Sequence, residues 1–333
     1  QALKRGELAV KWGRWERAIP CAGAFLLAAV LFGAQLFGGY APFALGLIAA
    51  AGSGKRGLAA LLGGVLGALA FLDFSHALRA LAVAVLLYTA NNAFCETKWY
   101  RSRFFLPVMT ALMHIAVEFV YLLQSGPDEA ADCLLSVALA MLAAVCARAA
   151  LDGGAFHEER RQAAGLVVGI GVLTAASSLQ FANGFAPGRI AAMLLVMLLA
   201  YDRGSGEALA AALGIGLALD LTAQPTGFLH TAVYSLGALA MGPERRARRV
   251  GAAALWCVPL VLLSLPLDAG QGMILLYEGL CATLVFLLLP SRLFGGKRLA
   301  APEEDADAAE TVQRTAAQQR LSATAAALRE LYD

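Results

Sequence analysis

The most restrictive feature of the sequence is a series of long apolar segments, of which Met273–Leu289 is the last. At about 1.5 Å per helical residue, this segment approaches the length that crosses a hydrocarbon core of about 30 Å. Because the backbone finds no water to bond with inside a bilayer, such segments form helices. Hydrophobic residues make up 59% of the chain and charged residues only 15%, a balance unlike that of soluble domains. The sequence therefore predicts an all-α, polytopic transmembrane helical bundle.

About ten, and up to twelve, hydrophobic segments are distinguishable. Three of them, beginning near Ala41, Ile190 and Phe228, are short, so any two of these can be half-helices rather than complete spans. The expected segments are Ala18–Phe37, Ala41–Ala51, Leu58–Phe74, Ala77–Cys95, Phe104–Leu123, Cys133–Leu151, Ala163–Gln180, Ile190–Tyr201, Glu207–Leu221, Phe228–Met241, Val250–Leu267 and Met273–Leu289.

Basic residues lie in alternate connections between these segments, and this asymmetry predicts the orientation of the chain. Of the 26 Lys and Arg residues, only Arg79 and Arg189 fall in connections expected to face outward. Cytoplasmic loops carry the excess of positive charge in membrane proteins, so both termini are expected in the cytoplasm of a multi-pass protein of the cell membrane. The strongest basic group is Arg245, Arg246, Arg248 and Arg249.

Four parts follow from these patterns. Residues 1–17 are a basic cytoplasmic juxtamembrane segment and 18–289 form the polytopic membrane domain. Residues 290–310 are a basic and then acidic linker, and 311–333 begin a cytoplasmic amphipathic helical region. Leu321, Ala325 and Leu328 share one face of that short helix, and the sequence ends within the pattern, which suggests that a longer protein continues.

Three ionisable residues inside the predicted spans are candidate functional residues, because charge near the middle of a bilayer is costly. His114 and Glu118 are four residues apart on one helical face, where they can pair, relay a proton or supply two metal ligands, although no third ligand is evident. Glu278 lies in the last span. Other polar residues, Asp73, Asp220, Asn91 and Asn92, lie near helix ends, where water or headgroups are expected to solvate them.

Glycines suggest either close helix packing or internal repetition. The pairs Gly63/Gly67 and Gly165/Gly169 have the small-xxx-small spacing that lets membrane helices approach closely. A short apolar helix, a turn with glycine and a basic residue, and a second small-residue helix recur around 52–57, 202–206 and 242–250. Such recurrence is found in transporters, but ordinary helical hairpins that obey the positive-inside rule give the same pattern.

No motif of enzymatic chemistry is present, and no catalytic, cofactor-binding or metal-binding residue is predicted. The sequence lacks a Gly-x-Ser-x-Gly elbow, a His-Glu-x-x-His motif and a dinucleotide fingerprint. The turn Gly52–Gly57 departs from a phosphate-binding loop at two positions, Ala49 and Arg56. The net charge of +2 gives no support for nucleic-acid binding. The six cysteines show no paired spacing and are interpreted as small buried hydrophobic residues.

The layout resembles the amino-terminal membrane region of the stage II sporulation protein E family. Three stretches carry the resemblance: GYAPFAL at Gly39–Leu45, LYEGL at Leu276–Leu280, and the tail QQRLSATAAALRELYD at Gln318–Asp333. The order of a basic amino terminus, about ten spans and a cytoplasmic helix also agrees, so the resemblance covers essentially the full chain.

The resemblance implies a larger protein than the residues themselves indicate. Members of that family resemble three-part proteins with a membrane domain, a central region for self-association and contact with the tubulin-like division protein, and a PP2C-type serine/threonine phosphatase that uses two Mn or Mg ions. That phosphatase activates a compartment-specific sigma factor by dephosphorylating an anti-sigma-factor antagonist. None of its metal-binding aspartates lies in this sequence, so no catalytic role is transferred to any residue here.

Three functions remain open at this stage. The first expectation is a non-catalytic anchor and assembly module that places the phosphatase at the sporulation septum and lets it self-associate in the bilayer. The alternative is a small-solute transporter or channel, which the short segments and the His114/Glu118 pair favour. An intramembrane enzyme is the third possibility, but the sequence offers it neither a nucleophile nor a metal set.

Overall fold

A computed structural model describes residues 19–125, 130–151, 158–181, 184–222, 227–241 and 249–290. The chain divides into two units, Gln1–Leu288 and Leu289–Asp333, and the fold below is that of the first. The basic segment predicted over 1–17 lies outside the described residues. So do the linker and tail helix predicted over 290–333, apart from Pro290.

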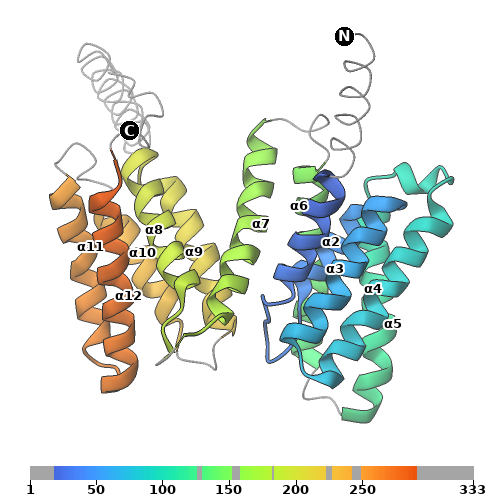
Figure 1. Ribbon diagram of the computed structural model, residues 1–333, viewed down its shortest axis with the longest axis horizontal. Helices are drawn as coiled ribbons and strands as arrows, with labels where there is room; N and C mark the ends of the chain where they lie inside the picture. The colour runs from blue at the N-terminus through green and yellow to red at the C-terminus, as the bar shows by residue number, and fades with distance from the viewer. Residues whose placement is uncertain are drawn as a thin grey trace, which may run out of the picture. The chain divides into compact units, whose positions relative to one another are not determined.

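Helices make up all the regular structure of the described residues, as the sequence predicts (Figure 1). A helix at Ile19–Leu31 precedes the labelled ones. These are α2 (Pro42–Ala51), α3 (Lys55–Phe71), α4 (Phe74–Phe94), the short 3-10 helix η1 (Trp99–Arg101), α5 (Phe105–Ser125), α6 (Ala130–Leu151), α7 (Glu158–Ser178), α8 (Pro187–Asp202), α9 (Ser205–Thr222), α10 (Leu229–Met241), α11 (Arg249–Ser264) and α12 (Ala269–Leu288).

Five of these helices are long and apolar enough to cross a membrane. They are Phe74–Phe94, Phe105–Leu123, Ala130–Leu151, Ser205–Thr222 and Gly270–Leu288. Large apolar side chains point outward, and Leu123, Leu265 and Leu288 are 72%, 71% and 74% exposed. Exposing this apolar surface to water would cost free energy, whereas lipid tails solvate it as well as a protein core does. The chain is therefore a membrane-embedded helical protein.

The outward-facing surface also corrects the interpretation of the cysteines. All six are free, but only Cys133 is buried, and Cys281 is exposed on α12. A cysteine facing lipid is as well solvated as one in the core, so apolar sequence context does not distinguish the two positions.

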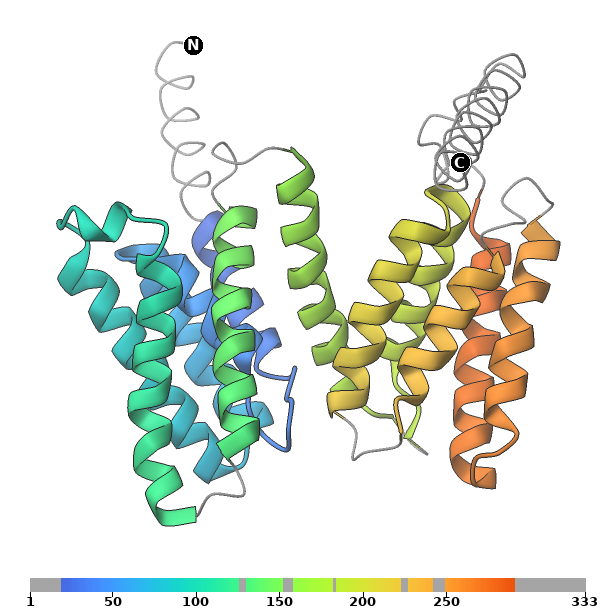
Figure 2. The same cartoon turned by 180° about the vertical axis from the view of Figure 1, so that it is seen from behind.

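The chain folds as two consecutive repeats, which we name the first repeat (19–151) and the second repeat (158–288). In the described residues each repeat contains six α-helices, and helices at matching places pack on matching partners. Thus α2 packs on α3, α4 and α6, as α8 packs on α9, α10 and α12. Likewise α5 packs on α4 and α6, as α11 packs on α10 and α12. Figures 1 and 2 show the two sets from opposite sides, with α7 beginning the second.

The loop after the first helix of each repeat gives the most detailed evidence for the repetition. Both loops contain glycine at positive φ (148° at Gly39, 81° at Gly184), and an Ala-Pro pair then opens the next helix. The same two backbone hydrogen bonds close both loops. They run from Leu36 N to Tyr40 O (2.7 Å) and Gly39 N to Leu36 O (3.2 Å), and from Phe181 N to Phe185 O (2.9 Å) and Gly184 N to Phe181 O (3.1 Å). Residues at a constant separation along the chain thus make equivalent contacts.

This repetition differs from the one that the glycine-rich turns suggest. The turns around 52–57 and 202–206 do occupy equivalent places, between α2 and α3 and between α8 and α9. The third turn, around 242–250, joins α10 to α11 and corresponds instead to the connection between α4 and α5. The repeating unit is therefore six helices long, rather than a single hairpin.

Close packing within the first repeat depends on one of the two predicted glycine pairs. A Cβ on Gly63 would lie 2.0 Å from the carbonyl oxygen of Phe25, and one on Gly67 would lie 2.3 Å from that of Ala29. By contrast, a Cβ on Gly165 or Gly169 would meet nothing within 4 Å. The small-xxx-small interpretation is thus confirmed for α3 and wrong for α7.

We predict that Gly63→Ala lowers the stability of the purified chain by about 1 to 3 kcal/mol, because the added methyl forces two backbones apart. The melting temperature in mild detergent, followed by circular dichroism, measures the loss. Gly169→Ala is the matched control and should leave the melting temperature unchanged or slightly higher, since alanine favours helix. Equal effects of the two substitutions would contradict the packing of α3 on the first helix.

Candidate functional site

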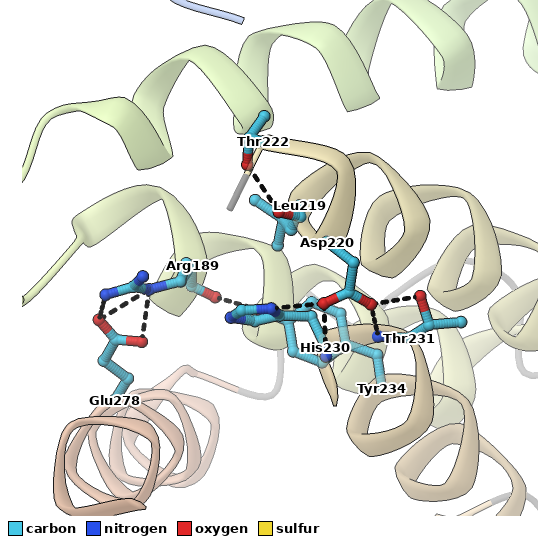
Figure 3. Close-up of polar contacts among 8 residues, drawn as sticks. All are labelled: Arg189, Leu219, Asp220, Thr222, His230, Thr231, Tyr234 and Glu278. Atoms are coloured by element: carbon cyan, nitrogen blue, oxygen red, sulfur yellow. Dashed lines mark hydrogen bonds and ion pairs between the residues drawn. The ribbon is translucent and has the colours of Figure 1, made fainter. Parts of the chain in front are cut away.

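The carboxylate of Glu278 fastens α12 to the start of α8. Pro187 and its neighbour Ala186 begin α8, and the Glu278 side chain is 1% exposed beside them. Its Oε1 accepts hydrogen bonds from the backbone N of Ala186 (2.8 Å) and from Nη2 of Arg189 (2.8 Å), and Oε2 accepts one from Arg189 Nε (2.8 Å). The charged pair is therefore both neutralised and hydrogen-bonded, the condition under which a buried ion pair persists (Figure 3).

Arg189 links this pair to two further parts of the second repeat. Its Nη2 also donates to the carbonyl oxygen of Gly184 in the preceding loop. Its own carbonyl oxygen accepts a hydrogen bond from the hydroxyl of Tyr234 on α10 (3.3 Å). One arginine thus joins the 184–186 loop, α10 and α12.

Asp220, at the end of α9, caps the beginning of α10. Its carboxylate accepts hydrogen bonds from the backbone N of His230 (2.9 Å), the backbone N of Thr231 (2.8 Å) and the Thr231 hydroxyl (2.7 Å). His230 Nδ1 lies 2.8 Å from the same carboxylate (Figure 3). The first N–H groups of a helix lack partners within it, so a carboxylate from another helix stabilises this end.

The first repeat also has an Asp–His pair at the start of a helix, but at its surface and with the aspartate directly before that helix. Asp73 caps α4, and its Oδ1 lies 2.6 Å from His76 Nδ1. Its slight burial would raise the pKa of Asp73, but the hydrogen bond and the charge of His76 outweigh this effect and hold the pKa below its usual value. Asp73 lies at an exposed helix end, as predicted, whereas Asp220 is 6% exposed, which corrects the expectation that it is solvated.

His114 and Glu118 lie together on α5, and Arg79 of α4 joins them. Glu118 Oε1 is 3.9 Å from His114 Nε2, and Glu118 Oε2 is 3.9 Å from Arg79 Nη1. The guanidinium of Arg79 also stacks 4.3 Å from the ring of Tyr121. His114 is 1% exposed, and its Nδ1 has no hydrogen-bond partner among the described residues. Within the described ranges, no three His, Cys, Asp or Glu residues gather as a metal site would require.

Both arginines assigned to outward connections lie instead inside helices, on buried carboxylates. Arg79 belongs to α4 and Arg189 to α8, and their partners are the predicted site residues Glu118 and Glu278. The sequence does not reveal these pairs directly, because their members are far apart along the chain. One sequence feature does point to them. An arginine that violates the positive-inside rule is expected to need a carboxylate partner.

Asn91 is a second polar residue that the structure places differently. It was expected near a solvated helix end, but it is 4% exposed, and its side-chain amide donates to the carbonyl oxygen of Ala49 (3.0 Å). That carbonyl belongs to the last turn of α2, where helical partners run out. Asn91 therefore joins α4 to the end of a ten-residue helix.

A cavity of about 360 Å³ lies between the two repeats. Its wall includes Gly33, Gln35 and Phe71 from the first repeat and Ser178, Gln180 and Arg189 from the second. Gly33 and Ser178 occupy equivalent positions, and a Cβ on Gly33 would lie 3.1 Å from the Ser178 hydroxyl. Gln35 and Gln180 are likewise equivalent. The repeats therefore meet at matching residues, and the cavity opens beside that contact.

Comparisons of the chain with protein family models, curated proteins and solved structures found no match.

We predict that Glu278→Gln destabilises the chain by about 3 to 5 kcal/mol, because Arg189 then keeps a buried charge without a counter-charge. Chemical or thermal unfolding in detergent measures the change. Glu207→Gln is the matched control. Glu207 of α9 pairs with Arg203, the residue that follows α8, in an exposed salt bridge (3.1 Å), where a loss of at most about 1 kcal/mol is expected. The double substitution Arg189→Gln with Glu278→Gln should be less damaging than Glu278→Gln alone. A double variant that is worse by the sum of both losses would rule out the pairing.

Proposed function

We propose that the chain is the membrane anchor and assembly module of a stage II sporulation protein E-like serine/threonine phosphatase. In this proposal both termini are cytoplasmic, the membrane domain gathers copies of the protein at the sporulation septum, and a phosphatase domain beyond Asp333 dephosphorylates an anti-sigma-factor antagonist. Its Mn or Mg ions and its contact with the tubulin-like division protein belong to those cytoplasmic parts. The chain itself then has no enzymatic activity.

The observation that carries the proposal is the attachment of α12, the helix that leads to the cytoplasmic tail. Glu278 fixes it to α8, and Gly279 lets Leu260 of α11 approach so closely that a Cβ would lie 2.3 Å from that leucine. Both residues belong to the LYEGL stretch on which the family resemblance rests. A helix held to two neighbouring helices in this way is a firm point of attachment, as an assembly module requires.

GYAPFAL, the other membrane stretch on which the family resemblance rests, also lies where a loop meets a helix. It contains the end of the first loop and the beginning of α2, and Ala41, Ala44 and Leu45 are at most 2% exposed. The resemblance thus rests on residues that pack in the interior of the first repeat. This placement supports a shared membrane fold more strongly than surface residues would.

In the sporulating cell, we predict that replacing Gln1–Arg298 of the full-length protein by an unrelated polytopic anchor abolishes septal enrichment but keeps the protein in the membrane. Fluorescence microscopy of a tagged protein measures the enrichment. Glu278→Gln in the same fusion should reduce septal signal, whereas Glu207→Gln should not. Unchanged septal localisation with the unrelated anchor would refute the proposed role of this chain.

A small-solute transporter or channel is the second candidate, and the cavity between the repeats favours it. Transporters commonly bind substrate where two repeats meet, next to interrupted helices. Here the loop residues 32–41, 179–181 and 184–186 interrupt the helices of the two repeats, and Gln35 and Gln180 of these loops line the cavity. This candidate predicts solute flux into proteoliposomes that weakens with Gln180→Ala, which alters the cavity wall. No flux across a broad panel of solutes would reject it.

A further inference from the structure

We propose that the cavity between the repeats binds a small, neutral, polyhydroxylated solute of the sugar or sugar-alcohol class. The proposal goes beyond the anchor function and does not depend on it. It rests on the hydrogen-bonding character of the wall, on the balance of its charges and on its size.

Hydroxyl groups on the second repeat present acceptors to the cavity. Ser177, Ser178 and Thr222 line it, and each hydroxyl donates its proton to a backbone carbonyl three residues earlier, at 2.6, 2.7 and 2.6 Å. With that proton engaged, each oxygen offers lone pairs to a bound molecule. A ligand that donates several hydrogen bonds therefore suits this side of the wall.

The charged groups at the cavity are already compensated. Arg189 lines it but is paired with Glu278, and His230 lines it but is hydrogen-bonded to Asp220 (Figure 3). An ion entering this space would lose its hydration without meeting an unpaired charge of opposite sign. The wall therefore favours a neutral ligand over an anion or a cation.

Amide and apolar groups complete the wall. Gln35 and Gln180 come from equivalent positions of the two repeats. Gln35 Nε2 donates one hydrogen bond to the carbonyl oxygen of Phe71, and its second N–H and its oxygen can still bind a ligand, as can the amide of Gln180. Phe71 and Leu219 provide apolar surface beside them. A polyol presents hydroxyl groups on some faces and C–H groups on others, and it matches this mixture. The volume of about 360 Å³ falls within the range of small-molecule sites.

The test measures binding of radiolabelled mannitol, myo-inositol and glucose to the purified chain in lipid nanodiscs, with putrescine and inorganic phosphate as charged probes. The altered protein carries Ser177→Ala and Thr222→Val, which remove two cavity acceptors with little change in volume. The control carries Ser264→Ala and Thr89→Val. These two hydroxyls also donate to carbonyls of their own helices (2.8 Å each), but neither residue lines the cavity.

We expect at least one of the three neutral solutes to bind saturably, and the cavity variant to weaken that binding about tenfold. The control variant should bind as the unaltered chain does, and all three proteins should melt at similar temperatures. Three results would overturn the proposal: no binding of any neutral solute, equal weakening by both variants, or competition for the site by putrescine or phosphate. Septal localisation is measured separately, so failure here leaves the anchor proposal intact.

Discussion

The need to satisfy backbone polar groups without water governs the structure. The helices of each repeat are interrupted early, at 32–41 in the first and at 179–181 and 184–186 in the second. An interrupted helix leaves N–H and C=O groups without helical partners. Local hydrogen bonds satisfy part of this need in both loops. In the second repeat carboxylates satisfy further groups at two helix starts. Glu278 accepts from Ala186 N before α8, and Asp220 accepts from the first N–H groups of α10. The buried carboxylates thus accept hydrogen bonds from the backbone and also balance positive charge.

The two repeats have the same arrangement of helices, but their buried charged residues are arranged differently. In the first, arginine and carboxylate come from adjacent helices, α4 and α5, and lie 3.9 Å apart. In the second, they come from α8 and α12, far apart in the chain, and form direct hydrogen bonds. Because Arg189 lines the cavity and Arg79 does not, the two walls of the cavity differ. The repetition therefore yields an asymmetric site.

Arg189 takes part in both the anchor proposal and the solute-binding proposal. Its guanidinium is part of the cavity wall and at the same time fixes Glu278, and hence α12, to α8. A solute in the cavity would contact the arginine that holds α12, the last of the described helices. Binding and assembly would then be linked through one side chain, without any long pathway of contacts.

Apolar content and segment length determined that this chain is a helical membrane protein, because a bilayer allows few other folds. The spacing of His114 and Glu118 likewise placed them on one helical face. The tertiary structure alone decided which charges meet, since Arg189 and Glu278 are 89 positions apart and nothing local specifies their contact. It also decided which glycines are needed for close packing. Gly63 lies against the backbone of a neighbouring helix, whereas Gly169 faces open space. Composition and periodicity are local properties, whereas ion pairs, close approaches and the cavity depend on which helices become neighbours.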